Sequence, residues 1–100
     1  MAHFLIVYRP PRPTFIDDST EEEDRVIGSH FQYLRALLAQ GKLLLAGPCE
    51  DGSMGLAVLE CKDGEEAKRI LAEDPAVRHG VFTGEIKPYR VSVWKKEGAG

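Results

Sequence analysis

Two residues of this sequence, His30 and Asp74, have types and spacing suited to acid–base chemistry. His30 lies four residues after Val26 and four before Leu34, so it falls on the apolar stripe of a predicted helix. Asp74 follows Ile70 by four residues, which places it on the sheet-facing side of a second predicted helix if helical geometry persists that far. A carboxylate beside an imidazole fixes the tautomer of the ring and stabilises its protonated form. We therefore expect His30 and Asp74 to form a catalytic pair that transfers protons.

Each of these residues also has a structural interpretation. A histidine on an apolar helix face is often a core residue with satisfied hydrogen bonds. Asp74 precedes Pro75 and is well placed to cap a short turn through Ala76 to Arg78. Capping and catalysis are compatible, so both roles stay open.

Weaker candidates for a substrate pocket lie at the ends of two predicted strands. Tyr8 and Arg9 end the first strand, where a side chain can reach an anionic or carbonyl group, although a strand-end tyrosine and a solvated arginine are common. Gly47 and Pro48 end the second strand and form a turn that matches no glycine-rich phosphate loop. We expect these four residues to contribute to the pocket.

The histidines and cysteines are too scattered to indicate a metal site. Cys49 and Cys61 are twelve residues apart without a further cysteine or a paired histidine nearby, which matches no zinc or redox motif. His3 and His30 lie far apart in the sequence, and His79 falls in a predicted loop. We expect reduced thiols, no metal and no cofactor.

The first predicted elements are a strand and a loop. Residues 3–9 are β-branched, aromatic and aliphatic for most of their length and lead into a proline cluster, which favours a strand. Residues 9–19 contain three prolines and no periodicity. We expect this second segment to be a loop that flanks the mouth of the pocket.

A long amphipathic helix follows the loop. Either Ser19 or Thr20 can cap its first turn, with Glu22 or Glu23 completing a capping box. Apolar residues then recur at helical spacing up to Gly41, the residue type that commonly ends a helix in the left-handed conformation.

The remaining predicted elements indicate the fold class. In chain order they are strands at 42–47 and 54–62, a helix at 65–73, and strands at 81–86 and 89–95 interrupted at Pro88. Apart from the additional strand, this order is that of the ferredoxin-like βαββαβ sandwich, an α+β fold in which an antiparallel sheet carries two helices on one face. We expect one domain over residues 1–96 and a flexible tail at 97–100.

The predicted strands are apolar on both faces. In the second strand, for example, Leu43 and Leu45 are expected to oppose Leu44 and Ala46. Two helices cover only one face of such a sheet, which leaves an apolar face exposed to water. A second copy packed face to face would cover it and form a dimeric α+β barrel. The alternative is a monomer whose loops or last strands cover that face.

Composition argues against two kinds of partner. The net charge is −3, from 16 acidic and 13 basic residues, and no basic run suits a nucleic acid. The apolar runs are far shorter than the roughly 20 residues of a membrane span, and the N-terminus lacks a signal-peptide pattern. We expect a cytoplasmic protein without nucleic-acid or membrane partners.

Several short motifs in register resemble the YciI-like (YCII-related) family. They are His30 to Leu34, Gly41 to Leu44, Ala46-Gly47-Pro48, Asp51-Gly52, Glu65-Glu66-Ala67 and Asp74-Pro75. The resemblance spans most of the chain and implies a ferredoxin-like subunit of a dimeric α+β barrel, with His30 and Asp74 lining the active site. It also implies chemistry on aromatic compounds, because one relative resembles a dehydrochlorinase and the wider superfamily holds isomerases and monooxygenases. The chain departs from this pattern in its proline-rich loop.

Two functions follow from these observations. The first is a cofactor-independent enzyme, similar to a lyase, dehydrochlorinase or isomerase, that acts on a small cyclic or aromatic molecule. The second is a non-catalytic homodimer that binds a small molecule or has a regulatory role. In this second function His30 only hydrogen-bonds within the pocket and Asp74 caps a turn.

Overall fold

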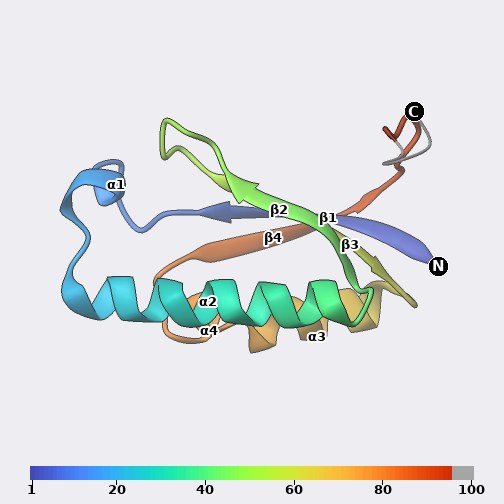
Figure 1. Cartoon of the computed structure of the whole chain (residues 1–100), viewed down its shortest axis with the longest axis horizontal. Helices are drawn as coiled ribbons and strands as arrows, with labels where there is room; N and C mark the ends of the chain where they lie inside the picture. Colours follow the sequence, from blue (N-terminus) through green and yellow to red (C-terminus); the bar gives the residue numbers. More distant parts are fainter. Residues whose placement is uncertain (96–100) are drawn as a thin grey trace.

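The computed structural model describes residues 1–95 and arranges them as one sheet with helices packed against it (Figure 1). Its elements are β1 (Ala2–Arg9), α1 (Phe15–Asp18), α2 (Glu21–Ala39), β2 (Leu43–Pro48), β3 (Gly55–Cys61), α3 (Gly64–Glu73), α4 (Pro75–Arg78) and β4 (Thr83–Tyr89). The predicted tail at 97–100 lies outside the described residues.

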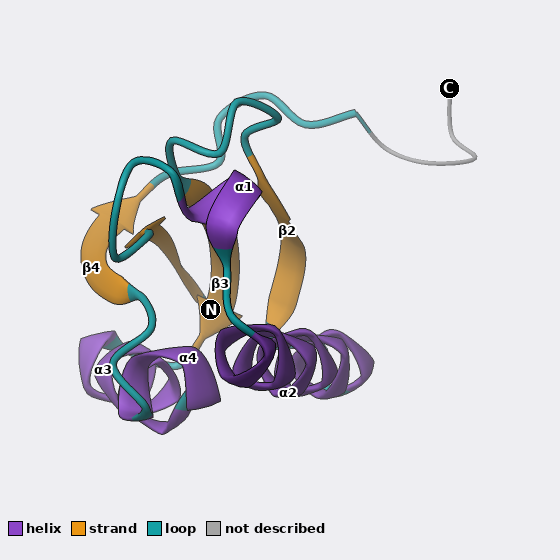
Figure 2. Cartoon of the chain, turned by 90° about the vertical axis from the view of Figure 1, so that its left-hand side faces the viewer, coloured by secondary structure: helices purple, strands orange, loops and turns teal. Residues whose placement is uncertain are grey.

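The four strands have the order β2-β3-β1-β4, and each neighbouring pair is antiparallel. Helices α2, α3 and α4 lie together on one face of this sheet (Figure 2). The arrangement is the ferredoxin-like βαββαβ sandwich, so the predicted α+β fold class is confirmed.

Helix α2 begins at the second of the two predicted caps. The Glu23 backbone N–H donates to Thr20 Oγ1 at 3.1 Å, and the Thr20 N–H donates to Glu23 Oε1 at 2.9 Å, which completes a capping box. At the other end Gly41 has a φ of 76°, the left-handed conformation that was expected there.

The last strand differs from its prediction. Strand β4 runs through Pro88 without a break, and the described residues that follow Tyr89 form no strand. Proline lacks an N–H donor, but β4 is an edge strand whose neighbour is β1 alone, so its other edge needs no donor. The loop at 9–19 also differs, since it contains the short helix α1.

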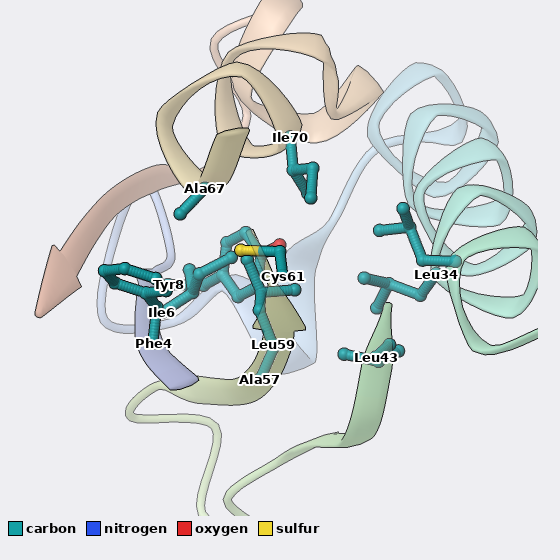
Figure 3. Close-up of a cluster of buried hydrophobic side chains, with 11 residues drawn as sticks. Phe4, Ile6, Tyr8, Leu34, Leu43, Ala57, Leu59, Cys61, Ala67 and Ile70 are labelled. Carbon is teal, nitrogen blue, oxygen red and sulfur yellow. The ribbon is translucent and has the colours of Figure 1, made fainter. Parts of the chain in front are cut away.

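The core fills the space between the helices and the sheet (Figure 3). Ile6, Leu59 and Cys61 from the sheet are completely or almost completely enclosed, and Leu34 from α2 and Ile70 from α3 pack against them. Cys61 and the half-buried Cys49 are both free thiols. The core therefore holds α2 and α3 on the same face of the sheet, with α2 next to β2 and α3 next to β1 and β4.

The sheet face opposite the helices is apolar over three strands. Phe4, Ile6 and Tyr8 face the core, so Leu5 and Val7 face the other side of the sheet. Val58 pairs with Leu5 and shares that side. Leu45 also pairs with Val58, because a register shift between Leu43 and Leu45 reverses the alternation. The expectation that Leu43 and Leu45 share a face is therefore wrong, since Leu43 is in the core and Leu45 is 46% exposed.

Candidate active site

His30 and Asp74 meet inside the protein. His30 Nδ1 lies 2.8 Å from Asp74 Oδ1 and 2.9 Å from Oδ2, and the two side chains are 5% and 0% exposed. Asp74 lies beyond α3, because its backbone is extended (φ −64°, ψ 125°) between α3 and α4. The expectation that helical geometry persists to Asp74 is therefore wrong, and the contact with His30 depends on the break between the two helices.

Asp74 accepts hydrogen bonds from two further groups. The Tyr8 hydroxyl donates to Oδ2 at 2.8 Å, and the Ala76 backbone N–H donates to Oδ1 at 2.9 Å. The second bond caps α4, whose first residue is Pro75, so the predicted capping role is confirmed. Burial, and secondarily the charge of Asp74 and its hydrogen bond, raise the pKa of the Tyr8 hydroxyl far above its usual value, so Tyr8 acts as a hydrogen-bond donor.

The Asp74 carboxylate determines which nitrogen of His30 is available. An ionised carboxylate only accepts hydrogen bonds, so Nδ1 carries a proton and Nε2 is the other functional atom. Nε2 makes no hydrogen bond to the described part of the chain. Among the described residues, every side-chain nitrogen or oxygen that is buried from solvent has a hydrogen-bond partner. Since Nε2 has no partner, it is not fully buried. His30 is also among the residues that line a cavity, and Nε2 is its ring nitrogen that is not bonded to Asp74.

Three aromatic rings hold the imidazole in place. The ring centroids of Tyr8, Phe31 and Phe82 lie 5.0, 5.4 and 5.5 Å from that of His30, and Tyr8 and Phe82 pack edge to face. These contacts leave little freedom for rotation of the imidazole.

The cavity beside His30 has a volume of about 330 Å³ and is mainly apolar. Its walls come from α2, from the β2–β3 hairpin and from the loop that contains α1. Apolar contributors from these three parts include Ile27, Phe31, Leu56, Met54, Phe15 and Ile16. Such a space suits a small molecule of the size of a substituted ring.

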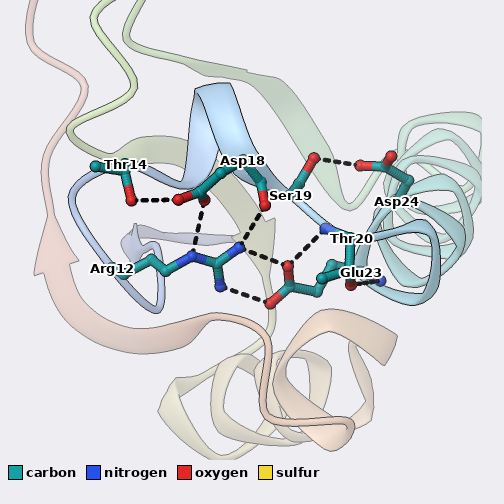
Figure 4. Close-up of polar contacts among 7 residues, drawn as sticks. All are labelled: Arg12, Thr14, Asp18, Ser19, Thr20, Glu23 and Asp24. Carbon is teal, nitrogen blue, oxygen red and sulfur yellow. Dashed lines mark hydrogen bonds and ion pairs between the residues drawn. The ribbon is translucent and has the colours of Figure 1, made fainter.

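An ion-pair network fixes the loop that forms one wall (Figure 4). Arg12 donates to both Glu23 carboxylate oxygens at 2.8 and 2.9 Å and to Asp18 Oδ1 at 2.8 Å. The Arg12 hydrogen bonds lower the pKa of the Glu23 carboxyl to about 2, and its guanidinium lies 5.4 Å from the ring of Phe15. The network anchors the loop to the start of α2.

The same loop also contacts the β2–β3 hairpin through residues that line the cavity. Gly52 has a φ of 77°, and a Cβ at this position would lie 3.0 Å from the Cβ of Ile16. Ile16 can therefore pack closely only because Gly52 has no side chain. Arg12, Phe15 and Ile16 were not among the expected site residues. An arginine followed by several acidic residues could have indicated that the loop is held in place by ion pairs.

The structure places the four weaker candidates on two sides of the sheet. Tyr8, Gly47 and Pro48 line the cavity, and Ala46 does so as well. Arg9 does not line it, because consecutive strand residues point to opposite faces and Tyr8 faces the helices. Arg9 instead is half exposed with its Nη2 3.8 Å from Glu85 Oε1, which corrects the expectation that it belongs to the pocket.

The described residues form neither a metal site nor a membrane-spanning helix. Among residues 1–95, no three His, Cys, Asp or Glu side chains are grouped so that they could hold a metal ion. None of the helices described is both long and apolar enough to span a membrane.

Comparisons with known proteins agree with this architecture. An uncharacterised protein, YjpA of Bacillus subtilis, is 32% identical over 65 residues, which cover 65% of this chain and 76% of that protein. A solved structure of 5-chloro-2-hydroxyhydroquinone dehydrochlorinase (TftG) from Burkholderia phenoliruptrix, in complex with 2,5-dihydroxybenzoquinone, superposes with a TM-score of 0.64. It is 20% identical, and the match covers 87% of this chain and 93% of that one. The model of the YCII-related domain matches residues 1–95, and the chain therefore belongs to the YCII-related domain family.

Proposed function

We propose that this protein is a cofactor-independent enzyme in which His30 is the general acid and base for a small cyclic or aromatic substrate. The observation that supports the proposal is that the two ring nitrogens of His30 differ in their contacts. Nδ1 is hydrogen-bonded to Asp74, whereas Nε2 has no partner among the described residues, and His30 lines the apolar cavity. A dyad of this kind accelerates proton transfer typically by two to four orders of magnitude.

The proposed chemistry is proton abstraction at Nε2. A bound ring gives up a proton from carbon or oxygen, and the electron pair left behind either expels a leaving group or shifts to a neighbouring position. The imidazolium that forms is stabilised by the Asp74 carboxylate, and the proton then passes to solvent or to the product. The fold that this chain shares with TftG, named as a dehydrochlorinase, is compatible with such an elimination.

A screen of hydroxylated and chlorinated rings with variant enzymes tests this function. On any substrate turned over, His30→Gln and Asp74→Asn should each lower kcat by at least about a hundredfold. Tyr33→Phe is a suitable control, because the Tyr33 hydroxyl donates to the Ile70 carbonyl and not to Asp74. If both site variants retained full activity, the pair would not be catalytic. Ligand binding without any turnover would favour the binding or regulatory function.

We also propose that two copies associate through the sheet face opposite the helices. Three of the four strands contribute apolar side chains to this face. Leu45 is exposed there and Leu5 is half-buried, whereas Val7 and Val58 are already buried within the single chain. A face of this kind is costly to leave in water, and the same face of a second copy is self-complementary. The proposed complex is a dimeric α+β barrel.

A further inference from the structure

The charged residues around the cavity are acidic. Apart from His30, Asp24 and Glu50 are the charged members of the set that lines it, and both are exposed. No lysine or arginine of residues 1–95 belongs to this set. Asp24 is held in place by Ser19, whose hydroxyl donates to Asp24 Oδ1 at 2.6 Å.

The arginines near the cavity are already paired. Arg12 packs against Phe15 but is bound to Asp18 and Glu23, so this cluster of one cation and two anions carries a net charge of −1. Arg25 is paired with Glu22 at 3.0 Å. These pairs leave an excess of negative charge, because residues 17–24 contain six acidic residues and no basic one.

The positive end of the α2 dipole does not outweigh this excess of negative charge. A helix N-terminus carries roughly half a positive elementary charge. The first turn of α2 alone contains four carboxylates: Glu21, Glu22, Glu23 and Asp24. The carboxylates outweigh the helix dipole, and an anion that approaches the cavity mouth is repelled.

The interior of the cavity also disfavours an anion. Its walls are mainly apolar, so a carboxylate or phosphate inside would lose water without gaining a counter-ion. The imidazole of His30 lies among the rings of Tyr8, Phe31 and Phe82, and its Nε2 has no hydrogen-bond partner among the described residues. With the proton on Nδ1, this atom accepts a hydrogen bond, so it can pair with one hydroxyl group of a ring.

From these observations, and resting on the proposed function, we infer that the cavity selects uncharged ring compounds and excludes rings that carry a carboxylate or phosphate. The substrate class is therefore a neutral ring with a hydroxyl group that donates to Nε2 of His30. Asp24 and Glu50 are the specificity-determining residues, because they are the fixed charges of the cavity lining.

Three matched rings test this inference on the full chain. They are 4-hydroxybenzyl alcohol, 4-hydroxybenzoate and 4-hydroxybenzylamine, which are neutral, anionic and cationic at pH 7 but differ little in size. Binding is measured by NMR titration, with the ring signals of His30 identifying the site. We expect the alcohol to bind at least about tenfold more tightly than the benzoate, given repulsion at the mouth and desolvation inside.

Two double variants test whether Asp24 and Glu50 cause the selectivity against anions. Asp24→Asn with Glu50→Gln should narrow the ratio between the alcohol and benzoate affinities by about threefold to tenfold. Glu65→Gln with Glu73→Gln changes the net charge by the same amount on the exposed surface of α3 and should leave the ratio unchanged. An equal response of the two double variants would show that net charge, and not these two residues, sets the ratio, and would overturn their assignment.

The possible outcomes separate this inference from the proposed function. Equal or tighter binding of the benzoate at His30 would overturn the charge selection and leave the acid–base proposal intact. Tightest binding of the amine would also overturn the neutral class, since the mouth would then select cations. If none of the three rings shifted the His30 signals, the inferred class of neutral hydroxylated rings would be overturned, and the substrate screen with the His30 and Asp74 variants would still test the acid–base proposal.

Discussion

The imidazole of His30 is bonded through Nδ1 to both carboxylate oxygens of Asp74, at 2.8 and 2.9 Å, in a fully buried contact between α2 and the break before α4. The carboxylate accepts further bonds from a side chain of β1 and from the backbone of α4. Asp74 therefore both orients the imidazole of His30 and links α2, β1 and α4 by hydrogen bonds.

Asp74→Ala should destabilise the protein severely, by about 3–5 kcal/mol, because it leaves the buried donors of Tyr8, His30 and Ala76 without an acceptor. Asp74→Asn should cost less, since its amide oxygen can still cap α4. Urea unfolding monitored by circular dichroism measures both. Equal stabilities of Asp74→Ala and the unmodified protein would contradict the described network.

Tyr8→Phe should cost about 1–3 kcal/mol and alter the ring ¹⁵N chemical shifts of His30, because Asp74 then loses one of its donors. Tyr33→Phe removes a comparable hydroxyl, 2.7 Å from the Ile70 carbonyl, and should leave those shifts in place. A Tyr8 variant with unchanged His30 shifts would mean that Tyr8 does not position the pair.

The Arg12 network should stabilise the fold at neutral pH and not in strong acid. The pKa of Glu23 is lowered from 4.5 to about 2 in the folded protein, chiefly by Arg12. A carboxyl with a depressed pKa stabilises the fold fully above its unfolded value, and this contribution is lost as pH falls from about 4.5 to about 2. The stability difference between the unmodified protein and Arg12→Gln should therefore shrink over this pH range. A difference that stayed constant would contradict the assignment.

The proposed dimer predicts unequal effects of a new charge at two exposed sites. Leu45→Glu places a charge on the sheet face opposite the helices and should shift the protein toward monomer in light scattering at micromolar concentration. Ala72→Glu, at an exposed site on α3, should leave the dimer intact. A monomeric unmodified protein would contradict the proposed assembly.

The order of the elements was predictable because its signals are local. The Thr20 capping box and Gly41 delimit α2, and alternation of apolar residues defines β1. The register shift in β2 was not predictable, because it depends on pairing with β3. Continuity of β4 through Pro88 depends in the same way on its place at the sheet edge.

The candidate site was predicted in part for a related reason. Helix phase placed His30 toward the sheet, and the Asp74-Pro75 pair indicated a cap. The tyrosine bond to Asp74 and the wall formed by Phe15 and Ile16 involve residues distant in sequence. Their contacts follow from tertiary packing, which no local pattern encodes.

The proposed function requires that Nε2 of His30 be available to a cavity ligand while Nδ1 is hydrogen-bonded to Asp74. Long-range ¹H–¹⁵N NMR of the His30 ring, recorded with and without 4-hydroxybenzyl alcohol, measures both nitrogens at once. The ligand should shift the Nε2 resonance and leave the resonance of the hydrogen-bonded Nδ1 nearly unchanged. A ligand that bound elsewhere without moving Nε2, or an Nδ1 without a bonded proton, would contradict it.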